Sequence, residues 1–208
     1  ECHEPSWVRT QNSKLKTQKF LLEYIEKIVE RYKNLEAIWS WQVENEPFFP
    51  FGECPKIDKD FLKKEIDLVK SLDPKRPIVI TDSGEFSFWI TPARLGDIVG
   101  TTLHRKVWFK ELKMYVSYPF KPVYYWRKAQ IIKKLFNKEV ICVELQAEPW
   151  GPKLLYDSQI EEQEKTMNLE QFRENIEFAK RTGFDTFYLW GGEWWFWMKN
   201  IQNKPEIW

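Results

Sequence analysis

Two glutamates in this sequence stand where catalytic carboxylates would be useful. Glu46, in the segment VENEP, and Glu144, in VICVELQ, each follow a run of residues that has the character of a buried strand. Two carboxyl groups that face each other across a pocket can hydrolyse a glycosidic bond, because one protonates the leaving oxygen while the other attacks or activates water. The positions of Glu46 and Glu144 predict that chemistry.

Each of these glutamates has a neighbour that competes for its role. Glu44 lies two residues before Glu46, which is itself beside a proline and could be an ordinary loop carboxylate. Glu148, in AEPW, competes with Glu144, but Glu144 follows the apolar run directly whereas Glu148 lies further out in the loop. We therefore assign the predicted pair to Glu46 and Glu144.

Alternating helix and strand patterns would position these residues. Apolar residues at steps of three and four predict helices, and runs of β-branched and aromatic residues predict strands. The expected helices cover residues 15–33, 58–72, 122–136 and 169–181, with a short helical piece at 88–95. The expected strands begin near residues 38, 77, 97, 139 and 185, and the last one covers DTFYLWGGEWWFW.

The spacing of the strands predicts the fold class. Their mean step of about 37 residues is the size of one strand plus its crossover helix in an α/β protein. The glycine-rich fingerprint of a dinucleotide fold and the phosphate-binding P-loop are both absent. Polar residues end each strand, so the chemistry would gather at one carboxyl-end face, and we predict a TIM (β/α)8 barrel.

Three segments, in order, resemble parts of a known enzyme group. The triplet Asn45-Glu46-Pro47 resembles the acid/base motif that ends strand four in clan A glycoside hydrolases, the (β/α)8 enzymes that include family 5. Glu144, three strands later, resembles their strand-seven nucleophile. The segment YLWGGEWW resembles their strand eight, whose tryptophan forms the floor of the sugar subsite. The resemblance covers nearly the whole chain.

The resemblance implies a role for each residue in a retaining β-glycosidase that needs no cofactor. Glu46 would be the acid/base, with its pKa raised by burial and nearby negative charge. Glu144 would form a covalent glycosyl-enzyme, which requires the two carboxyl groups to lie roughly 5 to 5.5 Å apart. Asn45 would hydrogen-bond the sugar 2-hydroxyl, and Trp190 would be the sugar platform. The substrate would be a β-linked oligo- or polysaccharide.

Further residues have both a binding and a structural interpretation. His104 ends a strand where clan A enzymes often place a histidine or tyrosine in the pocket, but a histidine satisfied in the core fits as well. Trp190 could instead pack the core with the tryptophans that follow it. Glu193 and Glu85 could hydrogen-bond substrate hydroxyls or bridge to helices. We include His104, Trp190 and Glu193 with Asn45 as predicted substrate-binding residues.

Composition excludes several other classes of partner. Lys+Arg 32 against Asp+Glu 31 give a formal net charge of +1, so the chain lacks the basic footprint of a nucleic-acid binder. No apolar run approaches the roughly 20 residues that a membrane span needs. The three cysteines, Cys2, Cys54 and Cys142, lack paired spacing and favour a cytoplasmic location. Cys2-His3-Glu4 is not expected to bind metal, and the oligomeric state is open.

Counting strands against the resemblance predicts an incomplete barrel. The first strand would be the family's fourth, ECHEPSW would be the loop that leaves strand three, and KNIQNKPEIW is short for the final helix. Five strands cannot close a barrel. We therefore expect residues 1–208 to be the strand 4 to strand 8 part of one catalytic domain, inactive by itself. The alternative function is an inactive carbohydrate-binding barrel, although binding alone does not require both Glu46 and Glu144.

Overall fold

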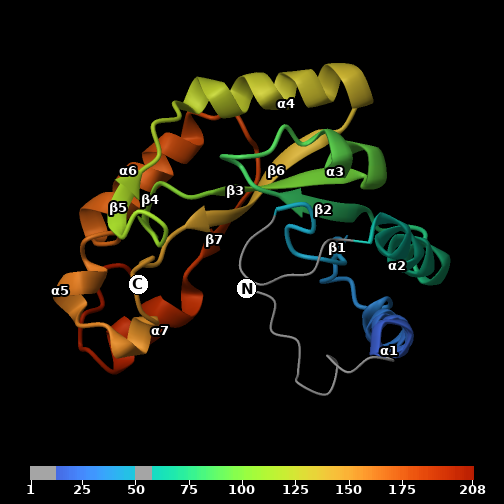
Figure 1. Ribbon diagram of the computed structural model, residues 1–208, viewed down its shortest axis with the longest axis horizontal. Coiled ribbons are helices and arrows are strands. Elements are labelled where there is room, and N and C mark those ends of the chain that lie inside the picture. The colour runs from blue at the N-terminus through green and yellow to red at the C-terminus, as the bar shows by residue number, and fades with distance from the viewer. Residues whose placement is uncertain (1–12, 50–57) are drawn as a thin grey trace. The chain divides into compact units, whose positions relative to one another are not determined.

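The computed structural model describes residues 13–49 and 58–208 and divides them into two compact units (Figure 1). The first unit contains the described residues up to Asp82 together with Trp89–Val99, and the second contains Ser83–Phe88 and Gly100–Trp208. ECHEPSW, with its Cys2-His3-Glu4 triplet, and Cys54 lie outside the described residues. None of the helices in the described ranges is long and apolar enough to cross a membrane.

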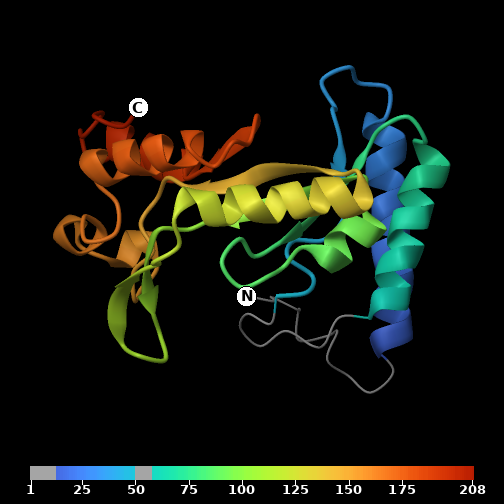
Figure 2. The same cartoon turned by 90° about the horizontal axis from the view of Figure 1, so that it is seen from above.

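The first unit is a parallel strand pair with helices packed beside it. Its elements are α1 (Ser13–Tyr32), β1 (Trp41–Gln42), α2 (Lys59–Leu72), β2 (Ile78–Asp82), α3 (Ile90–Leu95) and the start of β3 (Ile98–Leu103). β1 pairs in parallel with β2, and β3 follows β2 in the sheet. Figure 2 shows α1 and α2 side by side. Their apolar faces meet the strands in a core of Val29, Leu62, Ile66, Val69, Ile78 and Ile80.

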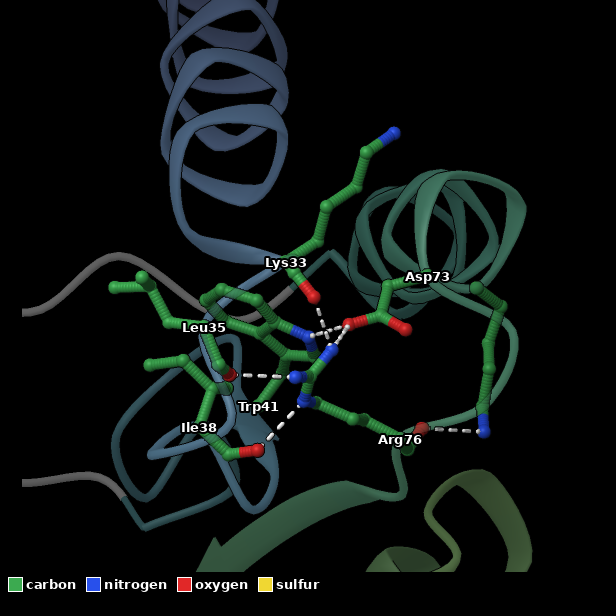
Figure 3. Close-up of polar contacts among 7 residues, drawn as sticks. Lys33, Leu35, Ile38, Trp41, Asp73 and Arg76 are labelled. Carbon is green, nitrogen blue, oxygen red and sulfur yellow. Dashed lines mark hydrogen bonds and ion pairs between the residues drawn. The ribbon is translucent and has the colours of Figure 1, made fainter.

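A single arginine joins the end of α1 to the turn before β2. Arg76 donates hydrogen bonds to the backbone carbonyl oxygens of Lys33, Leu35 and Ile38 (Figure 3). Its Nη1 also lies 2.7 Å from Asp73 Oδ2, which accepts a second hydrogen bond from Trp41 Nε1. Burial alone would raise the pKa of Asp73, but the hydrogen bonds from Trp41 and Arg76 and the charge of Arg76 lower it below its usual value.

We expect Arg76→Met to lower the free energy of unfolding by about 3 kcal/mol, because the three carbonyl groups lose the Arg76 donor and Asp73 loses its ion pair while keeping the hydrogen bond from Trp41. The control is Lys19→Met on α1, which removes an exposed ion pair with Glu23 and should cost less than about 1 kcal/mol. Chemical denaturation of both variants measures the difference. Equal losses would show that Arg76 contributes no more than a surface cation.

The second unit continues β3 and adds the remaining elements. They are β4 (Lys106–Phe109), β5 (Met114–Ser117), α4 (Pro122–Phe136), β6 (Glu139–Gln146), η2 (Leu155–Asp157), α5 (Ile160–Gln163), α6 (Leu169–Lys180), β7 (Phe187–Trp190) and α7 (Gly192–Asn200). Within this unit the sheet order is β3-β6-β7, with β6 parallel to β7 and Gln146 opposite Trp190. β4 and β5 form an antiparallel hairpin. α4 and α6 pack against β6.

The α/β class and the order of the main elements are confirmed. The four long helices match their predicted ranges within two residues, and each strand of the parallel sheet begins within three residues of its predicted start. The apolar run that begins at β3 does not continue as one strand. Gln146 Oε1 accepts hydrogen bonds from the backbone N–H groups of Arg105 and Lys106, which turns the chain out of the sheet and into the β4–β5 hairpin.

The prediction of one long final strand was wrong. β7 ends at Trp190, and the aromatic run WWFW lies in α7 instead. Gly191 adopts φ 149°, a backbone conformation that L side chains rarely take, and so breaks the strand. A Cβ at this position would also lie 2.6 Å from the backbone oxygen of Ala147. The first strand is also shorter than predicted, since β1 ends at Gln42, and the chain then turns at Glu46, which has φ 43°.

Candidate active site

The carboxyl end of β6, the strand that carries Glu144, is held in place by side-chain hydrogen bonds. Gln146, which is fully buried, accepts from the hairpin backbone and also donates from Nε2 to the carbonyl oxygen of Lys106 at 2.7 Å. Asn175 of α6 donates to the backbone oxygen of Gln146 at 2.9 Å. Two other elements of the second unit therefore fix this strand end. The half-buried Glu144 lies two residues before Gln146 on the same strand.

Three carboxyl groups interact at this strand end. Burial, together with the smaller effects of the Glu193 and Glu144 charges, raises the pKa of Glu148 to about 7. Glu144 and Glu148 are the two candidates for the nucleophile in the sequence. In the structure the charge of Glu144 affects the pKa of Glu148, so the two side chains belong to one site. A carboxyl group with this pKa is partly protonated at neutral pH, so Glu148 can donate a hydrogen bond where an ordinary glutamate only accepts.

His104 and Trp190, which are both predicted substrate-binding residues, lie together in an aromatic cluster. The ring centroid of His104 is 5.1 Å from that of Trp150 and 5.5 Å from that of Trp190, both edge to face. Burial lowers the pKa of His104 to about 4, so the imidazole is neutral at pH 7. Its Nε2 is buried and has no hydrogen-bond partner within the described residues. Sequence reasoning missed Trp150, although its place in the loop after Glu148 was a signal.

Glu85 accepts a hydrogen bond from the backbone of His104 and so helps to position it. One carboxylate oxygen accepts from Tyr125 Oη at 2.9 Å and from the backbone N–H of His104 at 3.2 Å. Burial raises the pKa of Glu85 to about 7, although these hydrogen bonds and the Lys128 charge oppose the shift. The side chain is only 4% exposed, so of its two predicted uses the structural one fits: Glu85 positions His104.

Glu46 lies in the first unit, in a turn that a buried threonine holds. Its backbone N–H donates to Thr81 Oγ1 at 2.7 Å, and its φ of 43° is unusual for a residue other than glycine. Such backbone conformations cost of order 1 to 3 kcal/mol and cluster at functional sites. Gln42 Nε2 donates a hydrogen bond to Asn45 Oδ1 at 3.0 Å, and Asn45 is exposed to solvent. The turn therefore presents Glu46 and Asn45 at the end of β1.

Glu44 has different surroundings from Glu46. Burial raises the pKa of Glu44. The charge of Glu44 in turn helps to raise the pKa of Glu65 to about 8, although burial of Glu65 is the larger cause. Glu65 belongs to the inner face of α2, is 2% exposed, and has one carboxylate oxygen without a hydrogen-bond partner within the described residues. Glu44 is thus coupled to the core of this unit.

We expect Glu65→Gln to stabilise the protein at high pH only. Because the pKa of Glu65 is raised in the folded state, its stabilising protonated form is fully present below about pH 4.5 and is lost as the pH rises through about 8. The variant should therefore match the wild type at pH 5 and gain about 2 kcal/mol at pH 9. Thermal melts at both pH values test this, with the exposed Glu36→Gln as control. A gain that is equal at pH 5 and pH 9 would contradict it.

The predicted site residues divide between the two units. Glu46 and Asn45 belong to the first, and Glu144, His104, Trp190 and Glu193 belong to the second. Within residues 13–49 and 58–208, no group of three histidine, cysteine or acidic residues is arranged to hold a metal ion.

Comparison with known proteins gives one family match and several partial relatives. Residues 2–195 match the family model described as the TIM barrel domain of glycosyl hydrolases family 2. This match agrees with the predicted barrel, whereas the likeness to family 5 in particular stays a prediction. The Mannan endo-1,4-beta-mannosidase A of Emericella nidulans is 32% identical over 65 residues, which are 31% of this chain and 17% of that protein.

A second relative and two solved structures extend the comparison. The Aspergillus clavatus protein named "Probable mannan endo-1,4-beta-mannosidase A" is 36% identical over 76 residues, which are 35% of this chain and 20% of that protein. The GH2 beta-galacturonidase of Eisenbergiella tayi has a TM-score of 0.58 at 15% identity, covering 88% of this chain and 30% of its own. The endo-1,4-beta-xylanase of Caldicellulosiruptor owensensis has a TM-score of 0.54 at 17% identity, and the match covers 90% of this chain and 62% of the xylanase chain. At these identities the two structures establish the fold alone.

Proposed function

Because the chain belongs to the TIM-barrel domain family of family 2 glycosyl hydrolases, we propose that this protein hydrolyses β-glycosidic bonds with retention of configuration. The substrate class is a β-linked oligo- or polysaccharide. The names of the two fungal relatives favour β-1,4-mannan as the first polysaccharide to test. The observation that carries the proposal is the carboxyl end of β6, where Glu144 lies beside the neighbouring strand ends that bring the buried His104 against the half-buried Trp190.

The proposed reaction has two displacements. In the first, a carboxylate oxygen of Glu144 attacks the anomeric carbon while Glu46 protonates the glycosidic oxygen, and the bond between that carbon and oxygen breaks. In the second, Glu46 takes a proton from water, whose oxygen attacks the anomeric carbon and displaces Glu144. Two inversions at one carbon restore the original configuration. The mechanism requires the Glu46 and Glu144 carboxyl groups to approach to roughly 5 to 5.5 Å in the working barrel.

The other predicted residues would bind the sugar. Trp190 would be the platform under the ring. It is held edge to face by His104 and in a tilted contact by Trp150, whose ring centroid lies 5.6 Å away. A cluster of large rings loses little conformational freedom when a ligand binds, which favours its use as a platform. Asn45 would hydrogen-bond the sugar 2-hydroxyl, a contact that is worth most in the transition state.

Covalent trapping tests the proposal. The full-length protein is incubated with a panel of 2-fluoro-glycosides, which slow the second displacement, and the labelled peptide is identified by mass spectrometry. An adduct on Glu144 is the expected result and would also identify the sugar. An adduct on Glu148 would keep the enzyme class and overturn the nucleophile. Folded protein that binds oligosaccharides but forms no adduct would favour the inactive carbohydrate-binding alternative.

A further inference from the structure

Apart from the cluster around Trp190, a hollow lined by aromatic residues lies beside the first turn of α7. It has a volume of about 670 Å³ and is lined by Gly192, Glu193, Trp195, Phe196 and Trp208. Phe196 and Trp208 are 60% and 61% exposed, which is high for rings of this size. The lining contains one carboxylate and no cationic side chain. We call this the α7 hollow.

The Trp195 ring of the α7 hollow is held by a hydrogen bond and a ring contact. Trp195 Nε1 donates to the backbone oxygen of Ala147 at 2.7 Å, and the Trp195 ring packs edge to face on Phe172. The Phe196 and Trp208 ring centroids are 6.3 Å apart, at an interplanar angle of 68°. A rigid aromatic wall of this kind binds a flat apolar surface with little loss of entropy.

The α7 hollow adjoins the end of β6. Trp195 is anchored on Ala147, the residue directly after that strand, and the charge of Glu193 helps to raise the pKa of the next residue, Glu148. Gly191 permits this approach, because a side chain there would collide with the Ala147 backbone. A ligand over Trp190 and one in the α7 hollow would therefore occupy neighbouring positions within the second unit.

We infer that the α7 hollow is a second sugar subsite, which binds a hexose unit of the same oligosaccharide next to the unit held over Trp190. The C–H face of a pyranose matches an aromatic ring, and the Glu193 carboxylate can accept hydrogen bonds from hydroxyl groups. The Lys199 ammonium lies 4.4 Å from the centroid of the Trp208 ring, so it stacks on one of the lining rings. This inference rests on the proposed function, since it deepens the account of that substrate.

Tryptophan fluorescence titration of the full-length protein with mannotetraose and cellotetraose tests the subsite without requiring turnover. For the tetrasaccharide that binds the wild type, we expect Phe196→Ala and Glu193→Gln each to raise the Kd about tenfold. The control is Leu135→Ala on α4, a residue 63% exposed, which should leave the Kd unchanged. Unchanged affinity in both hollow variants, or no binding of either tetrasaccharide to folded wild type, would overturn the subsite.

Kinetics then separate failure of the subsite from failure of the proposed function. In the wild type, kcat/KM is measured for the trapped sugar as an aryl monoglycoside and within a tetrasaccharide. Phe196→Ala should reduce the ratio of tetrasaccharide to monoglycoside kcat/KM about tenfold. An unchanged ratio in an active enzyme would overturn the subsite and leave the proposed function standing. Folded wild type that binds a tetrasaccharide through Phe196 but hydrolyses neither substrate would overturn the proposed function alone.

Discussion

Glu144→Gln is expected to abolish hydrolysis, with kcat reduced by about 10⁴-fold or more. An amide is a very poor nucleophile, so the glycosyl-enzyme cannot form. Because glutamine has nearly the same shape as glutamate, the substitution should leave the structure at the end of β6 intact. Single-turnover and steady-state assays on the full-length protein measure the loss. A thermal melt close to that of the wild type would show that the protein still folds.

Glu148→Gln is the matched control for this prediction, because Glu148 lies at the same strand end and interacts with Glu144. Removing its charge should change kcat far less than Glu144→Gln does, and should shift the pH profile of activity near neutrality. Equal, mild effects of the two variants would eliminate Glu144 as nucleophile. A severe loss in Glu148→Gln alone would transfer the role to Glu148.

The second large effect is expected for Glu46→Gln, and it should depend on the leaving group. Without the proton donor, a sugar leaving group departs as an unstable alkoxide, so kcat/KM on oligosaccharides should fall about 10²- to 10⁴-fold. A dinitrophenyl glycoside needs no protonation to depart, so formation of the glycosyl-enzyme from it should be nearly unaffected. Pre-steady-state release of dinitrophenol measures that step separately.

Glu44→Gln separates the role of Glu46 from the effect of a nearby negative charge. Glu44 is coupled to Glu65 in the core, so its substitution should alter stability without introducing a dependence on the leaving group. If Glu44→Gln produces that dependence and Glu46→Gln does not, the acid/base assignment moves to Glu44. Similar losses of Glu46→Gln on both kinds of substrate would argue against any role in protonation.

The long helices and the strand starts were predictable because their signals are local. The face of α2 that carries Leu62, Ile66 and Val69 is visible as a periodic pattern, and all three side chains are buried. The β4–β5 hairpin was not predictable, because a side chain forty residues away, Gln146, ends β3. α7 was missed because its aromatic residues favour strands, whereas the backbone conformation of Gly191 decides the outcome.

The candidate site was predictable in part for the same reason. Carboxylates and tryptophans at strand ends can be recognised in a sequence, whereas the contact of His104 with Trp190 is seen only in the structure. The electrostatic coupling among Glu144, Glu148 and Glu193 was not predictable, since it depends on the side-chain placement of a loop and of α7. The support that Glu85 gives to His104 also requires the contact with Tyr125 on α4.

Arg76 has a consequence for the order in which the first unit forms. The carbonyl groups after α1 find their donor some forty residues later in the chain, in the turn that follows α2. The connection from α1 to β1 therefore gains these hydrogen bonds only when α2 and that turn are in place. We therefore expect the loop after α1 and the turn before β2 to unfold together, because local unfolding of either one breaks the hydrogen bonds of Arg76.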